Sequence, residues 1–177
     1  MQVEVSVQDY FYDSLSEASN LELNHHCSDQ IAAETWETWF HCWLEILHPD
    51  IPPAPAYELS LRLTDDAEIQ SLNSQYRHQN KPTDVLAFAA LEVDCPQSAQ
   101  MQLSQPLYLG DIVISVETAQ RQAQQQAHTL QSELAHLAAH GLLHLLGWDH
   151  PDEDSLTQML DEQAILLDKI GLALNPT

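Results

Sequence analysis

The stretch from residue 128 to residue 150, HTLQSELAHLAAHGLLHLLGWDH, constrains the fold of this chain more than any other. Up to Leu146 it consists mainly of Ala, Leu and His, with one Gly and no Pro, and this composition predicts an α-helix. Gly147 follows the last leucine, and glycine readily adopts the left-handed conformation in which many helices end. The sequence therefore predicts a helix that stops at a sharp turn.

Three histidines on this predicted helix and turn have the spacing of metal ligands. His140 and His144 are four residues apart, so their imidazoles share one helix face. A turn at Gly147 can bring His150 back beside them. A single histidine pair is a weak motif and is often a surface or packed pair, but here it coincides with a glycine stop and a third histidine. Three imidazoles with an open fourth position are typical of catalytic zinc, so we predict one zinc ion per chain on His140, His144 and His150.

A fourth histidine, His136, lies one turn earlier in the same stripe. A straight helix with a rise of about 1.5 Å per residue spreads residues 136, 140 and 144 over about 12 Å. One zinc ion with bonds of about 2 Å cannot span that distance. His136 is therefore expected to contact one of the metal ligands without binding the metal, to face the substrate, or simply to pack in the core.

The spacing H-x-x-x-H-x-x-G-x-x-H resembles the zinc-binding run of the metzincin proteases, whose fold is zincin-like. Those enzymes carry a Glu directly after the first histidine, where it acts as the general base. Gly141 occupies that position here, so the carboxylate that a peptidase needs is missing. Protease chemistry is disfavoured unless a carboxylate elsewhere in the chain replaces it.

The negative charge of the chain limits how it can meet a nucleic acid. Five basic and 27 acidic residues give a net charge of −22. Neutralising phosphates requires clustered cations, so we expect no binding to DNA. Any RNA site must be local and built from a few cations and a metal ion, while the acidic surface suits contact with basic proteins.

Two of the five cations, Arg77 and Lys81, lie in the segment 73–88. A guanidinium stays charged and can bind two phosphate oxygens at once, so Arg77 is the strongest candidate for holding a phosphodiester beside the metal. The alternative is an ion pair with one of the 27 carboxylates. Lys81 is a further candidate, either facing the substrate or supporting the site.

The sequence also predicts where the protein resides. No apolar run approaches the roughly 20 residues of a membrane span, and the N-terminal residues lack the basic and apolar regions of a signal peptide. Cys27, Cys42 and Cys95 form no C-x-x-C pair and are expected to be free thiols. We therefore expect a cytoplasmic protein with no membrane partner.

Hydrophobic periodicity predicts an α+β fold, in which helices pack on a small mixed sheet within a single domain, residues 1–177. No glycine-rich phosphate loop is present, so a nucleotide-binding doubly wound fold is disfavoured. Strands are predicted around residues 3–7, 57–63, 85–88 and 107–116, and helices over 30–48, 65–76, 117–127, the histidine stretch and 155–170. The polar segments 13–29 and 90–106 are predicted to be insertions or loops.

Local patterns within these elements predict caps, a bulge and buried faces. Ser28 or Asp29 is expected to cap the helix 30–48, and Thr64 the helix 65–76. Gly110 suggests a bulge in its strand. The buried face of the helix 30–48 is predicted to be Trp36, Trp39, Phe40, Trp43, Leu44 and Leu47. The buried face of the last helix is predicted to be Leu156, Met159, Leu160, Ile165, Leu166 and Leu167.

Three motifs in the same order resemble the YbeY family of bacterial endoribonucleases and rRNA maturation factors. HGLLHLLGWDH matches the family's H-G-x-L-H-L-x-G-x-D-H, and LNSQYRHQNKPTDVLAF resembles its L-N-x-x-Y-R…P-T-D-V-L-S-F. LGDIVIS resembles the family strand L-G-D-I-x-I-S. The resemblance covers roughly residues 57 to 170. Ala87 replaces the usual Ser and Ala89 a common Pro, and neither position is a metal ligand.

The resemblance implies a zinc-dependent, single-strand-specific endoribonuclease that matures the 3′ end of small-subunit ribosomal RNA and takes part in ribosome quality control. It implies that Arg77 and His140 are catalytic and that His140, His144 and His150 hold the zinc ion. Ribosomal RNA and small-subunit ribosomal particles and proteins would be the partners.

Two further functions stay open at this point. The chain could be a zinc-stabilised assembly factor that binds a pre-ribosomal particle without cutting RNA, or a peptidase. The nucleophile (water or the RNA 2′-hydroxyl) and the general base are not assigned. Asp149 is expected to be a structural acceptor near the turn.

Overall fold

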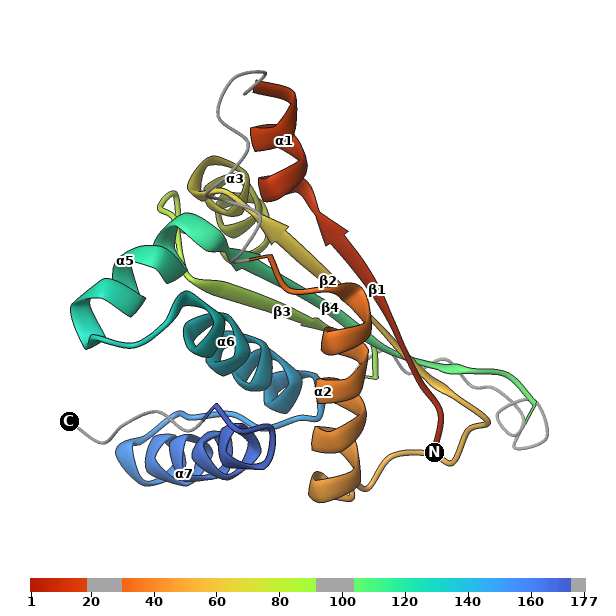
Figure 1. Cartoon of the computed structure of the whole chain (residues 1–177). Helices are drawn as coiled ribbons and strands as arrows, with labels where there is room; N and C mark the ends of the chain where they lie inside the picture. Colours follow the sequence, from red (N-terminus) through yellow and green to blue (C-terminus); the bar gives the residue numbers. More distant parts are fainter. Residues whose placement is uncertain (19–29, 92–103, 173–177) are drawn as a thin grey trace.

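The computed structural model describes residues 1–18, 30–91 and 104–172 (Figure 1). Within them, a four-stranded mixed sheet carries helices on both faces, which confirms the predicted α+β class. The strands are β1 (Val3–Asp9), β2 (Tyr57–Thr64), β3 (Val85–Ala89) and β4 (Leu107–Ser115). Their order is β1-β2-β4-β3, with β1, β2 and β4 parallel and β3 antiparallel to β4 at one edge. All four predicted strands are present.

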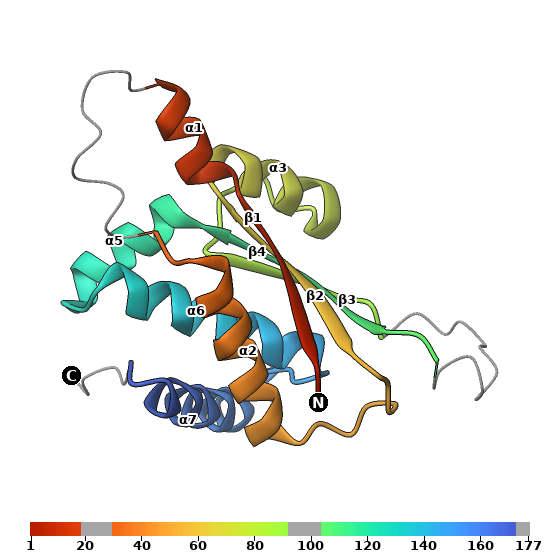
Figure 2. The same cartoon turned by 45° about the vertical axis from the view of Figure 1, so that its right-hand side comes forward.

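The helices form two layers on one face of the sheet and a smaller cover on the other (Figures 1 and 2). They are α1 (Tyr10–Ala18), α2 (Ala33–Leu47), α3 (Asp66–Arg77), α5 (Val116–Gln126), α6 (Leu130–Leu145) and α7 (Glu153–Lys169). α2 and α6 lie against the sheet, and α7 packs on the outside of both. The histidine helix α6 is therefore enclosed by the sheet and α7, which holds it in a fixed position.

The main core lies between the sheet and the α2–α6 layer. As predicted, α2 contributes an aromatic stripe, in which Trp36, Phe40 and Trp43 are completely buried. The Trp43 indole N–H also donates to the Leu166 carbonyl at 3.0 Å, which ties α2 to α7. Each such side chain contributes about 2–3 kcal/mol of burial energy, so this stripe is a large part of the core.

A small second core lies on the opposite face of the sheet, beneath α3. Ile69 of α3 packs there against Leu86 and Val113 of β3 and β4. Phe88 is half-buried at the margin of this cluster. This contact holds α3 against the strands β3 and β4.

The segment 13–29 was predicted to be a loop, and its first part is helical instead. α1 continues directly from β1 and extends to Ala18, because Asp9 caps it by accepting the backbone N–H of Tyr12 at 3.1 Å. Residues 19–29 lie outside the described residues, as do 92–103 of the predicted loop 90–106. The described ends of that loop, 90–91 and 104–106, belong to no helix or strand.

Two predicted helix caps differ in the structure. α2 begins after Ala32, which makes no side-chain capping hydrogen bond, and both Ser28 and Asp29 lie outside the described residues. α3 is capped by Asp65, not Thr64: its carboxylate accepts the Glu68 N–H at 2.9 Å. Thr64 is still part of β2, and its hydroxyl donates to the Glu68 carboxylate instead.

The predicted buried face of α7 is wrong at three positions. Leu156, Leu160 and Ile165 are 37–46% exposed. The helix buries Met159, Gln163, Leu166 and Leu167 instead. Only one stripe of α7 can contact α6 and α2. That stripe includes Gln163, which a search for hydrophobic periodicity does not detect because the residue is polar.

Gly110 confirms the predicted bulge in β4. Tyr108 is opposite Glu58 and Gly110 is opposite Leu59, so one residue of β4 is left without a partner on β2. Gly110 has a φ of 138°, which only glycine adopts readily.

The structure bears on two further predictions, the absence of a membrane span and the free thiols. No helix within the described ranges is long and apolar enough to cross a lipid bilayer. Cys42 is a free thiol, as predicted, whereas Cys27 and Cys95 lie outside the described residues.

Candidate metal centre

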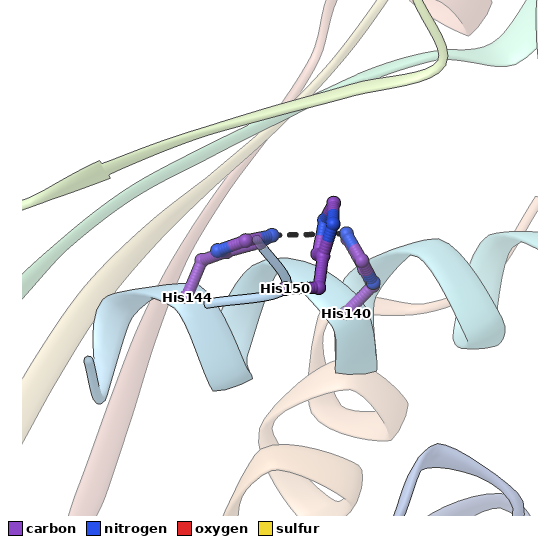
Figure 3. A group of neighbouring side chains, drawn as sticks. All are labelled: His140, His144 and His150. Atoms are coloured by element: carbon purple, nitrogen blue, oxygen red, sulfur yellow. Dashed lines mark hydrogen bonds between the residues drawn. The ribbon is translucent and has the colours of Figure 1, made fainter. Parts of the chain in front are cut away.

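The predicted helix stop is present at the end of α6. The helix ends at Leu145, and Gly147 has a φ of 94°. The Trp148 N–H then donates to the Leu143 carbonyl at 3.0 Å, which closes the turn over the last helical residues. This reversal brings His150 back alongside the helix (Figure 3).

Three imidazoles meet at this turn (Figure 3). One ring nitrogen from each of His140, His144 and His150 lies within 4.8 Å of the other two. Nε2 of His140 and Nε2 of His144 are 3.0 Å apart. In a tetrahedral zinc site with bonds of about 2.0–2.1 Å, two ligand atoms are roughly 3.3 Å apart. The three side chains therefore fit around a single metal ion.

Partial burial prepares His144 to be a metal ligand. Burial lowers the pKa of His144 below its usual 6.5, and repulsion from His140 and His150 lowers it further. A hydrogen bond with the Trp148 backbone acts in the opposite direction. A neutral imidazole keeps the lone pair that a metal needs. At the turn itself, Asp149 accepts the His150 backbone N–H at 2.8 Å, as the structural acceptor that was expected.

Gln163 orients one of these rings, and the sequence analysis missed it. Nδ1 of His140 lies 3.0 Å from Oε1 of Gln163, a fully buried residue of α7. The amide oxygen can only accept, so His140 donates its Nδ1–H and leaves the Nε2 lone pair facing His144. The available sequence signal was a glutamine at the buried phase of α7, four residues after Met159.

His136 lies behind His140 rather than in the space beside the ligands. The Gln163 amide N–H donates to the His136 carbonyl at 3.3 Å, and a His136 ring nitrogen is 3.4 Å from the same amide nitrogen. Burial, followed by repulsion from His140, lowers the pKa of His136 to about 4. Its ring is neutral at physiological pH and packs beside the glutamine that orients His140.

A cleft of about 810 Å³ opens in front of the three histidines. One wall is α6 with its C-terminal turn, including the exposed Trp148. The other wall is the edge strand β3 and the end of α3, with Tyr76 and Arg77. Ligand sites usually measure about 300–1,000 Å³, so the cleft has room for a substrate at the metal centre.

Arg77 is an exposed side chain on the wall of this cleft. Within the described part of the chain, Arg62 pairs with Glu68 at 2.6 Å and Arg121 pairs with Asp66 at 2.8 Å, whereas Arg77 forms no ion pair. Lys81 does not line the cleft. Its side chain is exposed, and its carbonyl accepts the Asn73 side-chain amide at 2.9 Å.

Gly141 allows α6 to approach the sheet closely. A Cβ atom at this position would lie 2.8 Å from Cγ2 of Ile112 in β4. A glutamate there would run into the sheet before it could reach the metal ligands. The position that carries the catalytic Glu in a metzincin protease is thus used here for close packing of α6 on β4. This packing is a structural reason against peptidase chemistry.

Two histidines from a helix, a third from the glycine turn after it, and an open cleft in front of them define a class of protein. This class is the metal-dependent hydrolases with a zincin-like ligand arrangement.

Comparisons with known proteins identify the family. The family model described as Endoribonuclease YbeY matches residues 22–171. Endoribonuclease YbeY of Nostoc sp. (strain PCC 7120) is 61% identical and covers 99% of this chain and 94% of its own. The protein of the same name from Trichodesmium erythraeum is 58% identical, with 97% and 94% covered. The solution structure of TM1509 from Thermotoga maritima shares the fold, with a TM-score of 0.52, 21% identity, and coverage of 96% of this chain and 89% of that one. The chain belongs to the YbeY family of endoribonucleases.

Proposed function

We propose that this chain is a zinc-dependent endoribonuclease that cuts single-stranded ribosomal RNA near the 3′ end of the small-subunit RNA. In this role it acts in the cytoplasm, in rRNA maturation and ribosome quality control, as one domain spanning residues 1–177. The observation that carries the proposal is an arginine with no ion pair to any described residue, on the wall of a three-histidine cleft, within a family of endoribonucleases.

The donor set supports zinc and one ion per chain. Three imidazoles suit a borderline-soft cation, and among the described residues no carboxylate belongs to the ligand group, which makes magnesium or calcium a poor match. His140, His144 and His150 would hold the ion and leave a fourth position open to the cleft. Bound zinc acts as a Lewis acid and lowers the pKa of a bound water to about 7.

Arg77 is the group of this chain that would hold the scissile phosphate. Its guanidinium can donate to two phosphate oxygens, and these bonds strengthen as negative charge builds up on the phosphorus oxygens. It faces the cleft without a carboxylate partner among the described residues, although the chain carries 27 acidic residues. His140 serves the reaction from the opposite wall as a ligand.

The net charge of −22 favours a local RNA contact over a broad one. It also suits binding to the basic proteins of the small ribosomal subunit, and it argues against DNA as a partner. The same charge favours a second candidate function, a zinc-stabilised assembly factor that does not cut. On that alternative the parent protein binds zinc and ribosomal particles but releases no RNA fragments.

Reversing the charge of Arg77 tests the proposed role. Arg77→Glu should lower the rate of cleavage of an end-labelled single-stranded RNA about 10²–10³-fold, the usual effect of losing one donor to a developing oxyanion. Zinc content should stay at one ion per chain, because Arg77 is not a ligand.

Lys169→Glu is the matched control. It makes the same change in net charge on an exposed residue near the end of α7 that does not line the cleft, and it should cleave like the parent. Equal losses in the two variants would mean that overall charge, not a local phosphate contact, governs the rate. No cleavage by the parent protein would favour the assembly factor.

Gln163→Met should weaken zinc binding about 10–100-fold, as expected when the acceptor behind a ligating imidazole is lost. Methionine preserves the volume but leaves the His140 Nδ1–H without its acceptor. Competition with a chelating dye measures the affinity, and Gln163→Glu, which retains an acceptor oxygen, should bind zinc more tightly than the Met variant. Unchanged affinity in the Met variant would show that the contact does not orient the ring.

A further inference from the structure

The structure holds a second hollow that adjoins the metal cleft. It has a volume of about 350 Å³ and lies between α3 and the open part of the opposite sheet face, with Ser60, Arg62 and Asp111 in its lining. Tyr76 and Phe88 line both this hollow and the metal cleft. The two spaces therefore adjoin at this aromatic pair, which lies on the path from one to the other.

Tyr76 is unusual for a large aromatic residue because 57% of it is exposed. It lies in the last turn of α3, directly before Arg77. Its ring forms an edge-to-face contact with Phe88, with centroids 5.2 Å apart and an interplanar angle of 67°. Phe88 is itself held at the margin of the core beneath α3, so Tyr76 has a supported position and a large free surface.

We propose that Tyr76 is a stacking platform for one base of the single-stranded RNA, at the point where the strand leaves the metal cleft for the second hollow. This inference rests on the proposed function and adds a contact that reads the substrate as an unpaired strand. A base can stack on the ring only when it is free of its own neighbours, so the contact favours single-stranded RNA over a duplex.

Charge and the position of Tyr76 between the two spaces both favour a base of RNA as the occupant. The cleft also contains Asp84 and Asp149, and Arg62 in the second hollow is paired with Glu68, so the path offers few free cations for the RNA backbone. A neutral aromatic ring binds a base without needing positive charge. With a phosphate at Arg77, the neighbouring residue Tyr76 is the nearest aromatic group along the chain for an adjacent base. An acidic protein can thus gain affinity for RNA through stacking.

The alternative is a tyrosine that only packs against Phe88. The two readings differ in whether the ring interacts with a particular base, and a cycle of changes on protein and RNA separates them. The protein is the zinc-loaded full chain, as the parent, Tyr76→Ala or Tyr76→Phe. The RNA is a single-stranded oligonucleotide, intact or with one abasic nucleotide placed in turn at each position flanking the cleaved bond.

For the parent protein, one abasic position should raise KM about 5- to 100-fold, the usual effect of losing one stacked base. Tyr76→Ala should raise KM for intact RNA by a similar factor, and the abasic change should then add little. Tyr76→Phe should behave like the parent because it keeps the ring. Tyr108→Ala, which removes an exposed tyrosine that lines neither space, should not change the pattern. Zinc content and the thermal melting of each variant verify that the fold is intact.

The stacking proposal is overturned if Tyr76→Ala cleaves intact RNA with the parent KM, or if the abasic change costs the same in both proteins. In either case the parent still cuts RNA, so the proposed function stands. A parent protein that cuts no RNA overturns the proposed function and the stacking contact together.

Discussion

Replacing His144 with alanine is expected to abolish stoichiometric zinc binding and to reduce RNA cleavage to background. Two imidazoles would remain, and two neutral ligands cannot complete a catalytic zinc site, which needs three protein ligands. Losing a residue that merely supports a ligand costs about 10–100-fold in affinity, so losing a ligand should cost more than that. Elemental analysis of the purified protein and cleavage of an end-labelled RNA measure the two effects.

His78→Asn is the control for this change. His78 is exposed, lies outside the three-histidine group and has a φ of 58°, a conformation that asparagine tolerates well. It should retain one zinc ion per chain and full cleavage. If His144→Ala also retained one zinc ion per chain, the assignment of the ligands would be wrong.

The largest expected effect on stability is at Gly110, where alanine should destabilise the fold by about 3–5 kcal/mol. A Cβ atom there would lie 2.1 Å from the Phe88 carbonyl oxygen and 2.8 Å from Cδ2 of Leu145. The first of these is a backbone atom of the edge strand and cannot move without separating β3 from β4. The positive φ adds strain for any residue with a side chain. In a chain of this length the melting temperature should fall by roughly 6–20 °C.

Gly171→Ala separates the effect of the positive φ from the effect of the steric clash. Gly171 has a φ of 77°, but a Cβ atom there would meet no atom of the described residues within 4 Å. Its substitution should cost only the backbone strain, about 1 kcal/mol. If thermal or urea unfolding showed the same shift for both variants, the close approach of β3 and β4 at Gly110 would not limit stability.

Local spacing was sufficient to predict most elements of this fold. Alternating apolar residues identified β1 and β2, because a half-buried strand has that period, whereas β3 and β4 were predicted from short apolar runs. The aromatic stripe of α2 was predicted because its apolar residues recur at spacings of three and four, which places them on one face of a helix. α1 was missed because it is short and polar after Tyr12, and it depends on a cap from Asp9 at the end of the preceding strand.

The three histidines could also be recognised from the sequence, since they come from one helix and the turn that ends it. Their distances depend on neighbouring backbone only, and Gly147 provides the turn. The supporting glutamine could not be recognised in this way. Gln163 is 23 residues beyond His140, and only the packing of α7 on α6 decides that it touches that ring.

The sequence by itself thus determined the local features of this protein: where most helices and strands form, which histidines can meet, and that Gly141 stands where a metzincin protease carries its Glu. Tertiary structure alone decided what depends on contacts between distant segments. It placed Arg77 in the cleft without a carboxylate partner among the described residues, and it set Tyr76 between two adjoining hollows. The physical reason is that backbone periodicity acts over a few residues, whereas the pairing of charges and the shape of a cleft depend on which surfaces the folded chain brings together.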